Sequence, residues 1–131
     1  MGFQVSWLVA DRVMEVSTFG TITKEDIIAL NDAVRRNTSP ATLHILYNAA
    51  EIEHPYFYKD ELLELVSVLS EDRIGWLVLT GHVSPLVHFM TTTFAAKAKL
   101  PIVRAKDRSE ALDLLLELDP TLATALVHGI A

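Results

Sequence analysis

The chain has 131 residues, half of them hydrophobic, and a formal net charge of -6, which suits one compact domain with a buried core. The negative charge argues against nucleic-acid binding, because phosphate backbones are bound by concentrated basic surfaces. The chain has no cysteine, which excludes disulfides and thiolate metal sites, and no apolar run approaches the roughly 18 residues that span a bilayer. We expect a single domain over residues 1–131 without membrane insertion, located in the cytoplasm because the first residues lack the basic region of a signal peptide.

The first two predicted strands form an antiparallel hairpin followed by a helix. Phe3, Val5, Trp7 and Val9 alternate with other residues, which is typical of a strand with one buried face. A second strand is predicted over residues 13–18, close enough in sequence to pair with the first.

The first predicted helix begins after Gly20, which is expected to end the second strand. Thr23 can cap the free backbone N–H groups, and Glu25 and Asp26 suit the positive end of the helix dipole. This helix should run to about Arg36.

Strands and helices alternate over the rest of the chain. Further strands are predicted over residues 43–47, 74–80 and 102–104, and further helices over 55–70, 85–99 and 107–118, with a short helix after Asp119 and Pro120. The segment 74–80 is almost wholly apolar, which is typical of a strand covered on both faces, so we place it centrally in a parallel sheet. The predicted class is α/β, in the order β-β-α-β-α-β-α-β-α, with a mostly parallel mixed sheet and an antiparallel N-terminal edge strand.

This order resembles the STAS-like domains, the family of anti-sigma-factor-antagonist-like proteins, over about residues 3 to 118. The resemblance rests on three segments: Phe19–Asp26 (FGTITKED), His44–Ala50 (HILYNAA) and Ser109–Leu115 (SEALDLL). It implies a STAS-like fold and a non-catalytic, regulatory protein-interaction module, which in some members is a homodimer.

The phosphorylatable members of this family carry a serine or threonine group after the strand that matches residues 43–48. The matching segment here, Asn48–Tyr58 (NAAEIEHPYFY), contains neither residue. The phosphoswitch of the family is therefore not carried over to this chain.

The segment after the predicted strand 74–80 holds two histidines and a serine. The end of a parallel strand beside a helix start is where α/β proteins place ligands, so an enzyme could use Ser84 as nucleophile or His82 as general base. A turn at Gly81 and a helix capped by Ser84 explain the same residues structurally. No G-x-S-x-G motif surrounds the serine, and His82 and His88 lack the i, i+4 spacing of helical metal ligands. We therefore predict no catalytic residue and no metal site.

A second candidate binding segment is aromatic. Three consecutive aromatic residues follow Pro55, and they cannot all face the core of a helix, because neighbours point about 100° apart. Exposed tyrosines anchor interfaces or line ligand pockets. The alternative is that the tyrosines lie at the edge of the core with their hydroxyls in contact with water. The predicted binding residues of both segments are His54, Tyr56, Tyr58, His82, Ser84 and His88.

Two further patterns bear on function. Leu86, Val87, Met90 and Phe94 form an apolar stripe in the predicted helix 85–99, which is more typical of a core face than of a cofactor site. No phosphate loop or dinucleotide motif occurs, so no cofactor is predicted. The chain also has a local basic group, which contrasts with its acidic middle: Lys97, Lys99, Arg104, Lys106 and Arg108. This group either is ordinary solvated surface or binds an oppositely charged protein.

Three classes of function stay open. The favoured one is a non-catalytic STAS-like regulatory domain that binds a protein partner through residues 54–59 and 81–84, with homodimer formation left open. The second is a small-molecule or lipid carrier with an apolar pocket beneath the helices 55–70 and 85–99. The third is a hydrolase-like enzyme that uses His82, Ser84 and His88.

Overall fold

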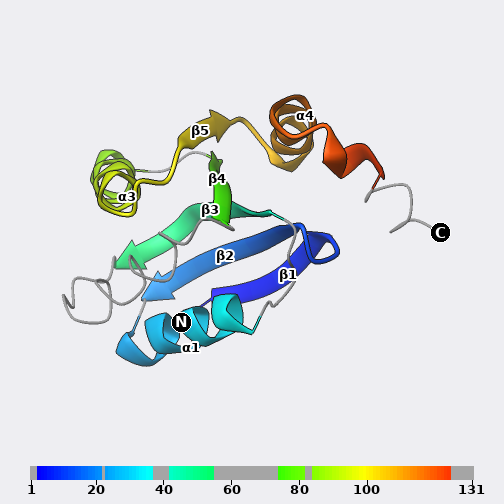
Figure 1. The fold of residues 1–131 in the computed structure, drawn as a ribbon. Coiled ribbons are helices and arrows are strands. Elements are labelled where there is room, and N and C mark those ends of the chain that lie inside the picture. Colours follow the sequence, from blue (N-terminus) through cyan, green and yellow to red (C-terminus); the bar gives the residue numbers. More distant parts are fainter. Residues whose placement is uncertain (1–2, 22, 37–41, 55–73, 82–83, 125–131) are drawn as a thin grey trace.

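The computed structural model describes residues 3–21, 23–36, 42–54, 74–81 and 84–124, and of residues 49–54 it describes the backbone only. The described residues form a five-stranded sheet in the spatial order β1-β2-β3-β4-β5 (Figure 1). The strands are β1 Phe3–Val9, β2 Val13–Thr21, β3 Leu43–His54, β4 Ile74–Thr80 and β5 Ile102–Ala105. The helices within these ranges are α1 Lys24–Arg35, α3 Pro85–Lys97 and α4 Arg108–Leu118. The predicted helix 55–70 lies outside the described residues.

The sheet is mixed. β1 pairs with β2 antiparallel, whereas the pairs β2–β3, β3–β4 and β4–β5 are parallel. β1 therefore lies at one edge, and β4 has a neighbour on each side, next to the central strand β3. This confirms the predicted α/β class with an antiparallel N-terminal edge strand.

Helices cover both faces of the sheet. One apolar cluster joins Met14 of β2 to Val34 of α1 and Ala95 of α3, and another joins Val13 of β2 to Leu115 of α4. Since Val13 and Met14 are neighbours in one strand, they point to opposite faces. α1 and α3 thus pack on one face, called the first face below, and α4 packs on the second (Figure 1).

The three described helices begin with side-chain caps, and those at Thr23 and Ser84 confirm the predictions. Thr23 Oγ1 accepts the Asp26 N–H at 3.3 Å, while the Asp26 carboxylate accepts the Thr23 N–H at 2.8 Å, which completes a capping box. Ser84 Oγ accepts the Val87 N–H at 3.2 Å, and Asp107 Oδ1 accepts the Glu110 N–H at 2.9 Å. Each cap contributes about 1 kcal/mol to helix stability.

Two strands are longer than predicted. β2 continues through Gly20, which takes the left-handed φ of 64°, to Thr21. β3 runs to His54 because its backbone pairs with the extended end of β2, where Thr21 lies opposite His54. The predicted end of this strand at residue 47 is therefore wrong, since pairing with a neighbouring strand overrides weak local preference.

The predicted apolar stripe of α3 is correct only in part, because Val87 is buried and Phe94 packs against the first-face core. Leu86 is 52% exposed, and the buried residues of the helix are Val87, Thr91 and Ala95, which lie on one face at i, i+4 spacing. Burial of Thr91 is tolerated because its hydroxyl donates to the Val87 carbonyl at 2.8 Å.

The end of α3 differs slightly from the expected residue 99. The helix closes with hydrogen bonds from the Lys99 N–H to the Ala96 carbonyl at 3.2 Å and from the Leu100 N–H to the Ala95 carbonyl at 2.9 Å. This is a Schellman ending, in which Lys99 takes the left-handed φ of 56°. The side chain of Leu100 is buried against the first-face core.

The two edge strands, β1 and β5, each carry an exposed side chain. Trp7 of β1, predicted on a buried face, is 41% exposed, because an edge strand is covered less completely than an interior one. β5 has only four residues and carries the exposed Arg104, and both features discourage pairing with other chains.

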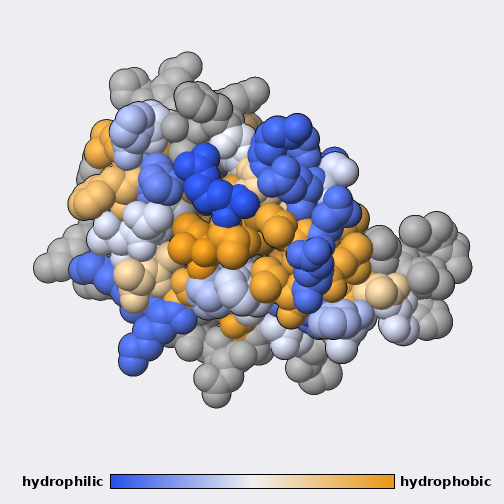
Figure 2. Space-filling view, turned by 90° about the horizontal axis from the view of Figure 1, so that it is seen from above, coloured by the Kyte–Doolittle hydropathy of each residue, from blue (hydrophilic) through white to orange (hydrophobic). Residues whose placement is uncertain are grey.

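Seen from above, apolar residues gather at the centre of the visible surface, and hydrophilic residues border them (Figure 2). No helix among the described residues is long and apolar enough to cross a membrane.

Candidate functional site

The candidate site lies at the carboxyl ends of β4 and β5. These two strands end level with each other, because Thr80 pairs with Ala105. The chain turns away from β4 at Gly81, whose φ of 79° is in the left-handed region that favours glycine. The sequence prediction of a glycine turn after this strand is confirmed.

Ser84 and His88 lie one turn apart at the start of α3. The exposed Ser84 is the N-cap, and its carbonyl accepts the backbone N–H of the half-buried His88 at 2.9 Å. The Ser84 hydroxyl oxygen accepts the Val87 N–H, so it has the structural role of satisfying a free N–H at the helix start. Of the other predicted binding residues, Tyr56, Tyr58 and His82 lie outside the described residues, and of His54 only the backbone is described, at the end of β3.

Two large apolar side chains are exposed beside Ser84 and His88. Phe89 is 66% exposed and Leu86 is 52% exposed, and their i, i+3 spacing puts them on the same side of α3. Sequence reasoning missed Phe89 and assigned Leu86 to the core. The sequence offers no clear signal for this, because the helix is apolar on almost every side; only the observed burial of Val87 turns positions 86 and 89 outward.

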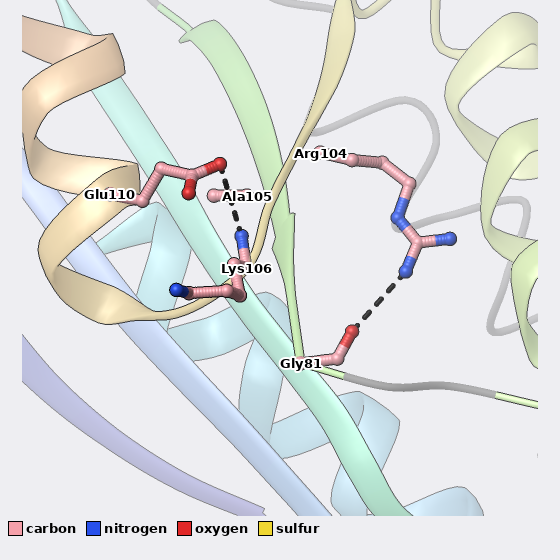
Figure 3. Close-up of a pocket in the computed structure, with 5 residues that line it drawn as sticks. All are labelled: Gly81, Arg104, Ala105, Lys106 and Glu110. Atoms are coloured by element: carbon pink, nitrogen blue, oxygen red, sulfur yellow. Dashed lines mark hydrogen bonds between the residues drawn. The ribbon is translucent and has the colours of Figure 1, made fainter.

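A shallow pocket of about 390 Å³ lies on the other side of the turn at Gly81. It is lined by Gly81, Arg104, Ala105, Lys106 and Glu110, which come from the ends of β4 and β5 and the start of α4 (Figure 3). Arg104 Nη2 donates to the Gly81 carbonyl at 3.2 Å, and the Lys106 backbone N–H donates to Glu110 Oε1 at 3.3 Å. These two hydrogen bonds fasten β5 to the turn after β4 and to the first turn of α4.

The predicted basic group is divided by the fold. Lys97 and Lys99 lie at the end of α3 that leads into β5, whereas Arg104 and Lys106 lie at the opposite end of this strand. Arg108 pairs with Glu15 of β2 at 2.9 Å. The pocket therefore draws its positive charge from Arg104 and Lys106.

A separate polar network lies at the opposite end of the sheet. His44 is 2% exposed; its Nδ1 accepts the Trp76 backbone N–H at 2.9 Å, and its Nε2 lies 2.8 Å from Asp119 Oδ2. Because Nδ1 accepts a hydrogen bond, the proton of the ring is on Nε2, which donates a hydrogen bond to the carboxylate. Arg12 Nη2 also donates to Asp119 Oδ2, at 2.9 Å. The network thus links the β1–β2 turn, β3, β4 and the segment after α4.

The environment of Asp119 favours its ionised form. Burial raises the pKa of this carboxyl, but hydrogen bonds from Thr121 and His44 lower it by more, so the pKa lies below its ordinary value. Because the His44 imidazole is buried and both of its nitrogens have partners, this pair holds the fold together and is not open to a substrate. Among the described residues, no group of three or more histidine, aspartate or glutamate side chains could hold a metal ion.

Comparison with known proteins bears on the fold. No protein-family model matches the chain, and no curated protein sequence matches it. The chain is similar to the crystal structure of an uncharacterised protein of the DUF3478 family from Shewanella loihica, which is described as having a SpoIIAA-like fold. The two chains are 15% identical and superpose with a TM-score of 0.64 over 87% of this chain and 92% of that chain. The chain therefore has the SpoIIAA-like, or STAS-like, fold that its sequence predicts.

Proposed function

We propose that residues 1–131 form a single STAS-like domain that is non-catalytic, acts in the cytoplasm and regulates a protein partner by binding it. The observation that carries this proposal is the exposure of Phe89 and Leu86 on one side of α3. The likeness to a SpoIIAA-like structure supports it at the level of fold alone.

The chemistry around these two side chains suits an interface. Transfer of a Leu or Phe side chain from water into an apolar contact contributes roughly 1.5–3 kcal/mol. The exposed Ser84 and the half-buried His88 lie beside them, and an apolar centre with a polar rim is typical of protein interfaces. Ser84 and His88 are thus proposed as rim residues of the contact.

The other two classes have weaker support. The apolar pocket of a carrier was predicted beneath the helices 55–70 and 85–99, and the first of these lies outside the described residues. An enzyme could use Ser84 as a nucleophile or His82 as a general base; the Ser84 hydroxyl oxygen accepts the Val87 N–H at 3.2 Å as a helix cap, and His82 lies outside the described residues. Neither alternative is favoured by a specific observation in the described part of the chain.

Affinity capture with matched variants tests the proposal. The wild-type chain, the double variant L86S/F89S and the control I28S are compared as baits, because Ile28 is also exposed, at 42%, but lies on α1. We expect to recover a partner that, once purified, binds the wild type and I28S directly. Its affinity for L86S/F89S should be at least about tenfold weaker. Light scattering of the same three proteins detects the case in which the partner is a second copy of the chain. Equal binding by all three baits, or no binding by any, contradicts the proposal.

A further inference from the structure

The chain changes from one face of the sheet to the other at β4 and β5. The connection after β4 leads to α3, which packs on the first face, and the connection after β5 leads to α4, which packs on the second (Figure 1). When connections leave two adjacent parallel strands toward opposite faces, a crevice opens outside their carboxyl ends, and ligands of α/β proteins bind there. The pocket lined by Gly81, Arg104 and Lys106 occupies this position.

The charges around this crevice favour an anion. Arg104 and Lys106 are exposed cations, and Glu110 is the one anionic side chain among the lining residues that the structure describes. The hydrogen bond to the Gly81 carbonyl holds the Arg104 guanidinium at the mouth of the pocket and uses one of its five N–H donors. The Glu110 carboxylate is held by the backbone N–H of Lys106, which keeps it on the side of α4.

The two cations approach the crevice from different sides. The Arg104 guanidinium extends toward Gly81, whereas the Lys106 ammonium extends away from it on the other side of β5 (Figure 3). The side chain of Lys106 is exposed, and its flexible four-carbon stem lets the ammonium rotate toward a bound anion. Arg104 thus supplies a positioned contact and Lys106 an adjustable one.

We propose that this crevice binds a small soluble phosphate monoester, with Arg104 and Lys106 as its cationic contacts. A phosphate monoester carries nearly two negative charges at neutral pH and presents three acceptor oxygens, so it can bind the guanidinium fork and an ammonium together. A carboxylate carries a single negative charge and therefore neutralises only one of the two cations. The volume of about 390 Å³ is at the lower end of the range of about 300–1,000 Å³ for ligand pockets, which suits a small ester. This inference goes beyond the proposed protein contact and does not depend on it.

NMR titration of the full chain tests the proposal with two probes, glycerol 3-phosphate and inorganic phosphate, each at constant ionic strength and about pH 7.5, where the second phosphate proton is dissociated. We expect saturable shifts of the Gly81 and Ala105 amides with glycerol 3-phosphate. R104Q should weaken this binding about tenfold or more, because a charge-assisted contact to phosphate is lost, and K106Q should weaken it several-fold. E110Q keeps the acceptor for the Lys106 N–H but removes a repulsive charge, so it should tighten binding.

The control is K97Q, which removes one positive charge at the far end of α3 and should leave the affinity unchanged. R104K keeps the charge without the planar fork and should fall between the wild type and R104Q. The proposal is overturned if glycerol 3-phosphate causes no saturable shift, if K97Q weakens binding as much as R104Q, or if inorganic phosphate binds and glycerol 3-phosphate does not. These outcomes leave the Leu86 and Phe89 experiment unaffected, because that experiment measures binding to a protein.

Discussion

His44 links β3 to β4 through its side chain, whereas most of the sheet is held by backbone hydrogen bonds. Its two ring nitrogens contact the Trp76 backbone and the Asp119 carboxylate, so loss of this ring leaves the Trp76 N–H without its partner and removes one of the hydrogen bonds to Asp119. An unsatisfied buried polar group costs about 1–3 kcal/mol. The neighbouring strand leaves room for the ring at one position, Gly75.

Replacement of Gly75 by alanine is expected to destabilise the protein. A Cβ at this position would overlap His44 Nδ1 and lie 2.8 Å from Thr42 Cγ2, so the imidazole must move and lose the Trp76 N–H. We expect G75A to lower the free energy of unfolding by about 2–4 kcal/mol, measured by urea denaturation. In an H44A background the same substitution should cost clearly less, because the overlapping ring is absent. Equal costs in the two backgrounds would show that His44 is not the source of the effect.

Asp119 makes the stability of the protein dependent on acid pH. Its pKa in the folded chain lies below the ordinary value of 3.8, so the stabilisation by its carboxylate is fully present above about pH 4 and is lost as pH falls through the folded-state pKa. We expect D119N to be less stable than the wild type at pH 7, by about 1–3 kcal/mol, and the difference to shrink as pH falls below about 4. Urea midpoints measured as a function of pH check this, with D113N on α4 as the control for net charge. A difference that is constant with pH would contradict the assignment.

At the scale of elements, α3 shows what a sequence does and does not determine. Ser84 and Pro85 predict where the helix begins, because capping and the fixed proline φ are local properties. The same sequence does not predict which side is buried, since Leu86, Val87, Phe89 and Met90 are apolar on almost every side. Packing against the sheet selects Val87, and the small Thr91 and Ala95 then allow close approach.

The end of α3 can be stabilised by glycine. Lys99 has the left-handed φ of 56°, a conformation in which a Cβ is unfavourable and glycine is preferred. We expect K99G to raise the free energy of unfolding by about 0.5–1 kcal/mol. K99A removes the same charged side chain but keeps the Cβ, so it should give no such gain in thermal or urea unfolding. A gain of equal size in K99A would assign the effect to the side chain instead of the backbone.

At the scale of the whole molecule, the order of elements along the chain was predictable and the contacts between distant residues were not. Apolar runs and caps are local features of consecutive residues, so the order of elements could be inferred from them, and the STAS-like fold followed from the resemblance of this order and three segments to that family. The length of β3 depends on its pairing with β2, and the crevice depends on the register that sets Thr80 beside Ala105. Neither register is encoded within a single segment, so Arg104 and Gly81 could not be paired from the sequence.

The second face of the sheet is closed by α4 together with the helical turn at residues 121–124. Leu122 of this turn is fully buried in the same cluster as Val9 and Leu115, so it joins the segment after α4 to the opposite edge of the sheet. We expect L122A to lower the free energy of unfolding by about 2–4 kcal/mol, because it leaves a cavity in this layer. The matched control is L118A, since Leu118 is 38% exposed and should cost less than about 1 kcal/mol. If both variants lose the same stability in urea denaturation, the turn contributes no more to the core than an exposed helix end, and the second face is closed by α4 alone.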